Sequence, residues 1–93
     1  MTQPRLEIWK FPLDTHNTEQ RYQWPYINNV LEIQMQDGVP VMWAVVRPDT
    51  VPRLYKVMRF LTGDTVYGFN SHLGTVQLAS GDVLHYFSGG PGL

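Results

Sequence analysis

One pair of strand-like segments, joined by Asp37-Gly38, constrains the fold of this chain more than any other feature. The segment VLEIQMQ, residues 30–36, alternates apolar and polar side chains, as a strand with one buried face does. Asp37-Gly38 follows it, and this dipeptide readily takes the positive φ angles of a tight hairpin turn. The return segment VPVMWAVV, residues 39–46, is apolar throughout, which is typical of a strand buried on both faces. The sequence therefore predicts a central antiparallel hairpin with Trp43 packed in the core.

Further short segments on both sides of this hairpin are rich in β-branched and aromatic residues and are separated by turn residues. Residues 53–61 could also form a helix, because Leu54, Met58 and Leu61 recur at helical spacing, but the density of Tyr, Val and Phe favours a strand. We expect an all-β fold of about seven strands, a small antiparallel barrel or sandwich, with one short helical turn in a connection as the alternative. The expected strands outside the hairpin cover residues 6–11, 21–25, 53–61, 65–69, 73–79 and 83–87.

Length and composition narrow the class of protein. A chain of 93 residues has room for one hydrophobic core, so we expect a single domain over residues 1–93. The net charge of −1 offers no basic surface for duplex nucleic acid, and no apolar run is long enough to span a membrane as a helix. The chain has no cysteine, which excludes disulfides and thiolate metal ligands and fits a cytoplasmic location.

The sequence contains no recognisable catalytic or metal-binding motif. Ser71 and His72 are neighbours, but neighbouring strand residues point to opposite faces and make a poor nucleophile–base pair. His72 and His85 could meet across the last hairpin and hold a metal, although packed or solvated histidines are the simpler interpretation. GxSxG, P-loop and HExxH motifs are absent. We therefore expect a protein that is not an enzyme and that carries no cofactor and no metal.

Arginines and aromatic residues beside the expected loops are better candidates for a binding site. Arg47 and Arg53 flank the loop RPDTVP, and guanidinium groups suit phosphates. Trp24 and Tyr26 are next to Pro25, where their rings could stack on a nucleotide base. The alternative is that the arginines only keep the surface soluble. The residues that we expect to bind a ligand are Trp24, Tyr26, Arg47, Arg59, Thr62, Asp64 and His72.

Three segments together carry a resemblance to a known family: IWKFPL at residues 8–13, DGVPVMWAVVRPD at 37–49 and LGTVQLASGDVLHYF at 73–87. In this order they resemble a family of small, mostly phage-encoded domains. That family is similar to the phage anti-CBASS sponge proteins, which sequester the cyclic nucleotide signals of anti-phage defence. The resemblance implies an immune-evasion protein of the host cytoplasm that binds a cyclic di- or oligonucleotide without cleaving it, in sites shared between subunits.

Self-association is also expected from composition. A small domain with this many large apolar residues leaves some of them exposed, and symmetric homo-oligomers are the usual way to cover such surface. We expect a dimer or a tetramer. Two other functions stay open, namely a protein-binding inhibitor or small structural phage protein without a nucleotide ligand, and a small metal-dependent hydrolase.

Overall fold

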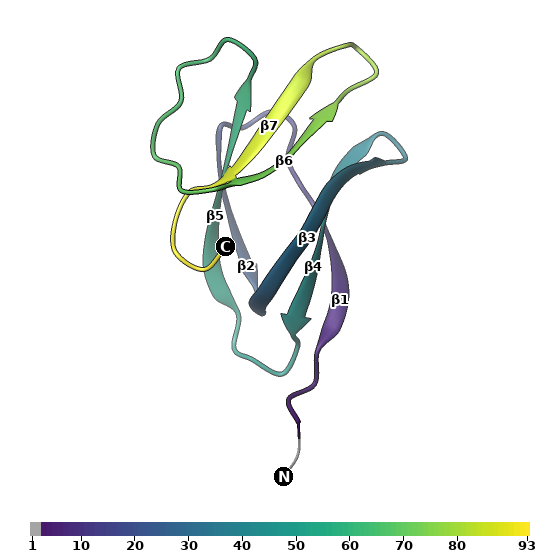
Figure 1. Cartoon of the computed structure of the whole chain (residues 1–93), viewed down its shortest axis with the longest axis vertical. Coiled ribbons are helices and arrows are strands. Elements are labelled where there is room, and N and C mark those ends of the chain that lie inside the picture. The colour runs from purple at the N-terminus through teal and green to yellow at the C-terminus, as the bar shows by residue number, and fades with distance from the viewer. Residues whose placement is uncertain (1–2) are drawn as a thin grey trace.

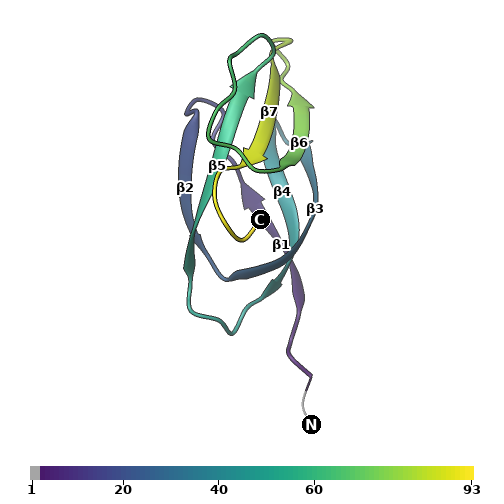
Figure 2. The ribbon, with the colours of Figure 1, turned by 60° about the vertical axis from the view of Figure 1, so that its left-hand side comes forward.

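The computed structural model describes residues 3–93, which form seven antiparallel strands in two facing sheets (Figure 1). One sheet has three strands in the order β1-β4-β3, and the other has four in the order β2-β5-β7-β6. Figure 2 shows the two layers from the side. The strands are β1 (Glu7–Pro12), β2 (Glu19–Trp24), β3 (Tyr26–Gln36), β4 (Val39–Arg47), β5 (Arg53–Leu61), β6 (His72–Gln77) and β7 (Val83–Ser88).

These strands confirm the expected all-β fold and make it a sandwich rather than a closed barrel. Residues 53–61 form β5, so the helical alternative for them is wrong, and residues 3–93 contain no helical turn in any connection. The central hairpin is also confirmed: Asp37 and Gly38 have φ angles of 51° and 80°, and Gln36 pairs with Val39.

The core lies between the two sheets. Even-numbered residues of β4, such as Met42 and Ala44, are fully buried against inward residues of the other sheet, such as Tyr55 and Tyr86. Trp43 lies on the opposite face of β4, where it is only half-buried. The expectation that Trp43 is part of the core is therefore wrong, because no second layer formed by residues 3–93 covers the outer face of the three-stranded sheet.

The segment at residues 65–69, expected to be a strand, is instead part of the loop between β5 and β6. Its aromatic rings lie on the outer face of the four-stranded sheet. The Tyr67 ring meets the edge of Phe60 at 5.6 Å between centroids, and Phe69 lies 4.9 Å from Phe87. The segment has strand-like composition because it covers apolar side chains, and no strand pairs with it.

Candidate ligand-binding surface

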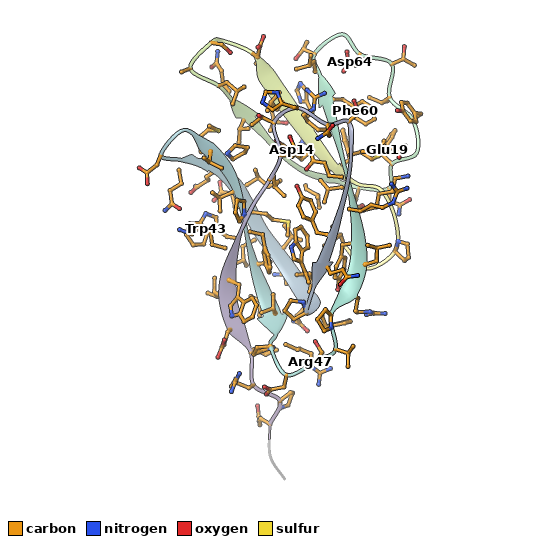
Figure 3. All side chains as sticks on the ribbon, turned by 180° about the vertical axis from the view of Figure 1, so that it is seen from behind. Asp14, Glu19, Trp43, Arg47, Phe60 and Asp64 are labelled. Atoms are coloured by element: carbon orange, nitrogen blue, oxygen red, sulfur yellow. The ribbon has the colours of Figure 1, made fainter. Side chains whose placement is uncertain are left out.

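The structure separates the seven predicted binding residues into three places. One group lies at the end of the sandwich where β4 leads into β5, a second is buried between the sheets, and a third lies on or beside the outer face of the four-stranded sheet. Figure 3 shows Arg47 and Asp64 at opposite ends of the molecule. The groups are Tyr26 with Arg47, Trp24 with Arg59, and Thr62 with Asp64 and His72.

Trp24 is not available to a ligand. The residue is 8% exposed, and its ring stacks on Tyr22 with centroids 4.5 Å apart and planes at 10°. Phe11 and Tyr55 pack against it at 4.6 Å and 5.8 Å. The expected stacking role is therefore wrong, because β2 turns its even-numbered side chains into the core and Trp24 is the last of them.

Arg59 is also buried, with 9% of its surface exposed. It pairs with Tyr86 across the sheet, and cross-strand partners share a face, so its side chain lies between the sheets. Its Nη2 donates to Thr18 Oγ1 at 3.4 Å, and its Nε has no hydrogen-bond partner among residues 3–93. A phosphate on the surface cannot reach this buried guanidinium as expected, since the residues before β2 cover it.

The polar groups around this end of the core bond mainly to one another. The Tyr86 hydroxyl donates to the Asp14 carbonyl oxygen at 2.8 Å, and the Gln20 amide donates to the same oxygen at 2.8 Å. The Tyr22 hydroxyl donates to Gln20 Oε1 at 2.6 Å. Burial raises the pKa of both tyrosine hydroxyls. The backbone N–H of His16 donates to the Asp14 carboxylate and lowers its pKa, so this carboxylate serves the turn rather than Arg59.

Tyr26 and two arginines form a cluster at the other end of the sandwich, which we call the basic end. The guanidinium carbons of Arg47 and Arg53 lie 5.9 Å and 5.3 Å from the centroid of the Tyr26 ring. Both arginines are exposed, and neither forms an ion pair within the described part of the chain. The nearby carboxylate of Asp49 is paired with Arg5 at 3.2 Å instead. The donors of both guanidinium groups are therefore free to bind an anion.

The backbone around this cluster is fixed by Thr50. Its Oγ1 accepts the Tyr26 N–H at 2.8 Å and donates to the Arg47 carbonyl oxygen at 2.7 Å. This ties the start of β3 to the loop between β4 and β5, which is the loop RPDTVP singled out in the sequence. Sequence reasoning identified both arginines of the cluster but could not show that they share one ring.

A cleft of about 260 Å³ begins one residue after Tyr26 along β3. It lies between β3, the start of β6 and the end of the chain. Sequence reasoning found His72 but missed the two asparagines, which offer amide donors and acceptors; consecutive polar residues in a strand would have been the signal. The cleft is lined by Asn28, Asn29, Ser71, His72, Leu73 and Leu93, among others.

The third group is joined through His85, which the sequence analysis had paired with His72, and through Thr75, which it had not singled out. Thr62 Oγ1 lies 2.8 Å from His85 Nε2, and Thr75 Oγ1 lies 3.0 Å from His85 Nδ1 and 2.8 Å from His72 Nε2. Asp64 instead accepts the Leu61 N–H through Oδ2 at 2.8 Å, which is the role of a carboxylate in a turn.

Two absences apply to the part of the chain that the structure describes, residues 3–93. No three or more His, Asp or Glu side chains gather closely enough to hold a metal ion. No helix there has the length and apolar character needed to cross a membrane.

The fold and the basic end define a small β-sandwich domain with a cationic, aromatic surface cluster. The chain belongs to a family described as a domain of unknown function, DUF7352, whose model matches residues 5–91. Neither the curated proteins nor the solved structures contain a significant match to it.

Proposed function

We propose that this protein is a phage immune-evasion protein that binds a cyclic di- or oligonucleotide and sequesters it without cleaving it. The observation that carries the proposal is the basic end. Two exposed guanidinium groups lie near one tyrosine ring, and no carboxylate in the described part of the chain forms an ion pair with them. A nucleotide offers the two groups that such a cluster recognises, phosphate oxygens for guanidinium donors and a base that stacks on planar groups.

The adjacent cleft supplies the polar contacts that a base edge needs. Asn28 and Asn29 line it, and side-chain amides hydrogen-bond to both donors and acceptors. Its volume of about 260 Å³ is below the roughly 300–1,000 Å³ of pockets that enclose a drug-sized ligand. We therefore place the phosphates against Arg47 and Arg53 and the base at the cleft, with a second copy of the chain in a homo-oligomer completing the enclosure.

The hydrogen bonds of Ser71 and His72 support the proposal that the bound nucleotide is not cleaved. The Ser71 hydroxyl lies 3.1 Å from Ser88 Oγ, whereas His72 Nε2 bonds to Thr75. The serine is thus hydrogen-bonded to another hydroxyl rather than to an imidazole that could remove its proton. The resemblance to phage sponge proteins supports the same conclusion.

Binding to another protein is the second candidate function, and exposed apolar side chains favour it. Ile8 is 64% exposed on the outer face of the three-stranded sheet, and Leu54 is 63% exposed on the other sheet. Exposed apolar surface of this kind commonly marks a protein interface. A partner protein would cover these residues, and nucleotides would then have no effect on the isolated chain.

A thermal-shift screen against cyclic nucleotides of different ring size and linkage distinguishes the two functions. A ligand at a hundredfold its dissociation constant adds about 2.7 kcal/mol to the free energy of unfolding, which is a clear rise in melting temperature. Recovery of the intact nucleotide after denaturing the complex tests sequestration against hydrolysis. If no nucleotide shifts the melting temperature, the protein-binding function is the better explanation.

Variants locate the site. We expect Arg47→Ala and Arg53→Ala each to weaken nucleotide binding by about 1.5–3 kcal/mol, because each removes a charge-assisted hydrogen bond to phosphate. Arg21→Ala is the matched control, since Arg21 is exposed on β2 and pairs with Glu19 at 3.7 Å. If both test variants bind the nucleotide as tightly as the control does, its phosphates bind at another part of the surface.

A further inference from the structure

The outer face of the four-stranded sheet carries two imidazoles that point at one hydroxyl oxygen. His72 Nε2 lies 2.8 Å and His85 Nδ1 lies 3.0 Å from Thr75 Oγ1. The other ring nitrogen of His85, Nε2, lies 2.8 Å from Thr62 Oγ1. The cluster joins β6, β7 and the turn after β5, and it is exposed or half-buried throughout.

A β-bulge in β6 creates this convergence. His72 and Thr75 are three positions apart, and in a regular strand they would face opposite sides of the sheet. The pairing shifts between His72 and Gly74, so one additional residue is inserted and both side chains face outward. Gly74 is needed there, because a Cβ at this position would lie 2.8 Å from Ile33 Cβ of the facing sheet.

The number of protons on His72, His85 and Thr75 limits which hydrogen bonds these three side chains can form together. Each neutral imidazole has one N–H and one lone pair, and a hydroxyl has a single proton to donate. When His85 donates its Nε2–H to Thr62, its Nδ1 lone pair faces Thr75. When His72 carries its proton on Nδ1, its Nε2 lone pair faces Thr75 as well. Thr75 can then donate to only one of two lone pairs that converge on the same place.

We propose that His72 and His85 form a binding site for a transition-metal dication such as Zn²⁺ or Cu²⁺. Imidazole nitrogens prefer these ions over Mg²⁺ or Ca²⁺. A tetrahedral zinc ion with N ligands at about 2.0–2.1 Å holds two nitrogens about 3.3 Å apart. Both imidazole nitrogens lie within 3.0 Å of Thr75 Oγ1, so the ion would replace this hydroxyl as their shared partner.

Thr62 lies where a hydrogen-bond acceptor is needed beside a metal-ligating histidine. A metal-ligating histidine donates its other ring N–H to an acceptor, which fixes the tautomer and the ring orientation. Thr62 Oγ1, 2.8 Å from His85 Nε2, is placed to act as that acceptor when Nε2 carries the proton. The edge contact of the His72 ring with Phe87, at 5.1 Å between centroids, restricts the second imidazole. Water would complete the coordination, because no third His, Asp or Glu joins the pair among residues 3–93.

Titration calorimetry with Zn²⁺ and Cu²⁺ tests the site, using untagged protein and no nucleotide. We expect one ion per chain, and binding at least about tenfold weaker in His72→Ala and in His85→Ala. His16→Ala is the matched control, because it removes the third histidine, which lies in the connection before β2, and it should bind as the wild type does. Mg²⁺ should produce no binding heat.

Imidazole ¹⁵N spectra provide an independent reading: the ion should shift the signals of His72 and His85 and leave those of His16 unchanged. His85→Asn replaces the alanine variant if a melting curve shows that the latter is unfolded. The proposal is wrong if the wild type binds neither ion, or if both histidine variants bind as tightly as the His16 control. These outcomes do not depend on the proposed nucleotide function, since the metal is the only ligand present.

Discussion

The space between the two sheets and the outer surface of the sandwich contain the same residue types in opposite circumstances. Trp24 and Arg59 lie inside, where Trp24 packs among aromatic rings and Arg59 has an unpartnered Nε. Trp43 and Arg47 lie outside, where the Lys10 ammonium sits 5.8 Å from the Trp43 ring and Arg47 lies over Tyr26. The difference shows that residue type alone does not determine whether a side chain is part of the core or accessible at the surface. This depends on whether another layer covers the strand face from which the side chain projects.

Alanine substitutions of Trp24 and Trp43 should differ most in their effect on the free energy of unfolding. Trp24→Ala removes a ring packed against Phe11, Tyr22 and Tyr55, and we expect a loss of about 3–5 kcal/mol in the free energy of unfolding. Trp43→Ala removes a half-buried ring on an uncovered face, and we expect a loss below about 2 kcal/mol. Urea denaturation of both variants measures the difference, and equal losses would mean that the outer face is covered in solution.

The hydroxyl of Tyr86 should have an intermediate effect. Tyr86→Phe removes its bond to the Asp14 carbonyl oxygen, and we expect a loss of about 1 kcal/mol near neutral pH. Tyr26→Phe is the control, because within residues 3–93 Tyr26 is held by its backbone N–H, which donates to Thr50 Oγ1, and its hydroxyl forms no hydrogen bond there. A loss in the control as large as that in Tyr86→Phe would contradict this assignment.

The same hydroxyl predicts a dependence on pH. Burial raises the pKa of Tyr86 in the folded state above the value of about 10 that it has in the unfolded chain. The neutral hydroxyl is therefore favoured by folding, and this stability is complete below about pH 10 and is lost as the pH rises above it, by at most about 1.4 kcal/mol per pH unit. Tyr22 contributes in the same direction. Denaturation curves on both sides of pH 10 should fall less steeply for Tyr86→Phe than for the wild type.

The two arginines should show the smallest effects on stability. Arg59→Met replaces a buried cation by an apolar side chain of similar length, so we expect a change between zero and a gain of about 1 kcal/mol. Arg47→Met alters an exposed residue and should stay within about 0.5 kcal/mol. Thermal denaturation of the pair checks both values. A loss above about 2 kcal/mol in Arg59→Met would show that the buried guanidinium is held by partners that stabilise it.

Much of the fold could be predicted because its signals are local. Alternation at residues 30–36, the Asp37-Gly38 turn and the apolar strand that follows act between near neighbours, and they specified a hairpin that the structure contains. The prediction of a strand at residues 65–69 was wrong because it also used only local composition. A loop whose aromatic rings cover a sheet has the same composition as a strand.

The candidate site could be predicted only in part. Tyr26 and Arg47 do come together, because the start of β3 pairs with the end of β4, but this pairing depends on two register shifts along β3 that the hairpin alone does not predict. The imidazole pair was raised as a possibility, but its link through Thr75 and Thr62 depends on a one-residue bulge that no pattern in the sequence reveals. Such an insertion depends on packing against Ile33 in the other sheet, which is a long-range contact.

The sequence by itself determined the all-β class, the central turn and every strand except the one expected at residues 65–69, because propensity and alternation act between neighbouring residues. Only the tertiary structure decided which faces are covered. A central strand such as β4 is apolar on both sides, yet one side meets the other sheet and the opposite side does not. Burial depends on how the layers stack, and this stacking placed Trp24 and Arg59 inside and left Trp43 and Arg47 at the surface.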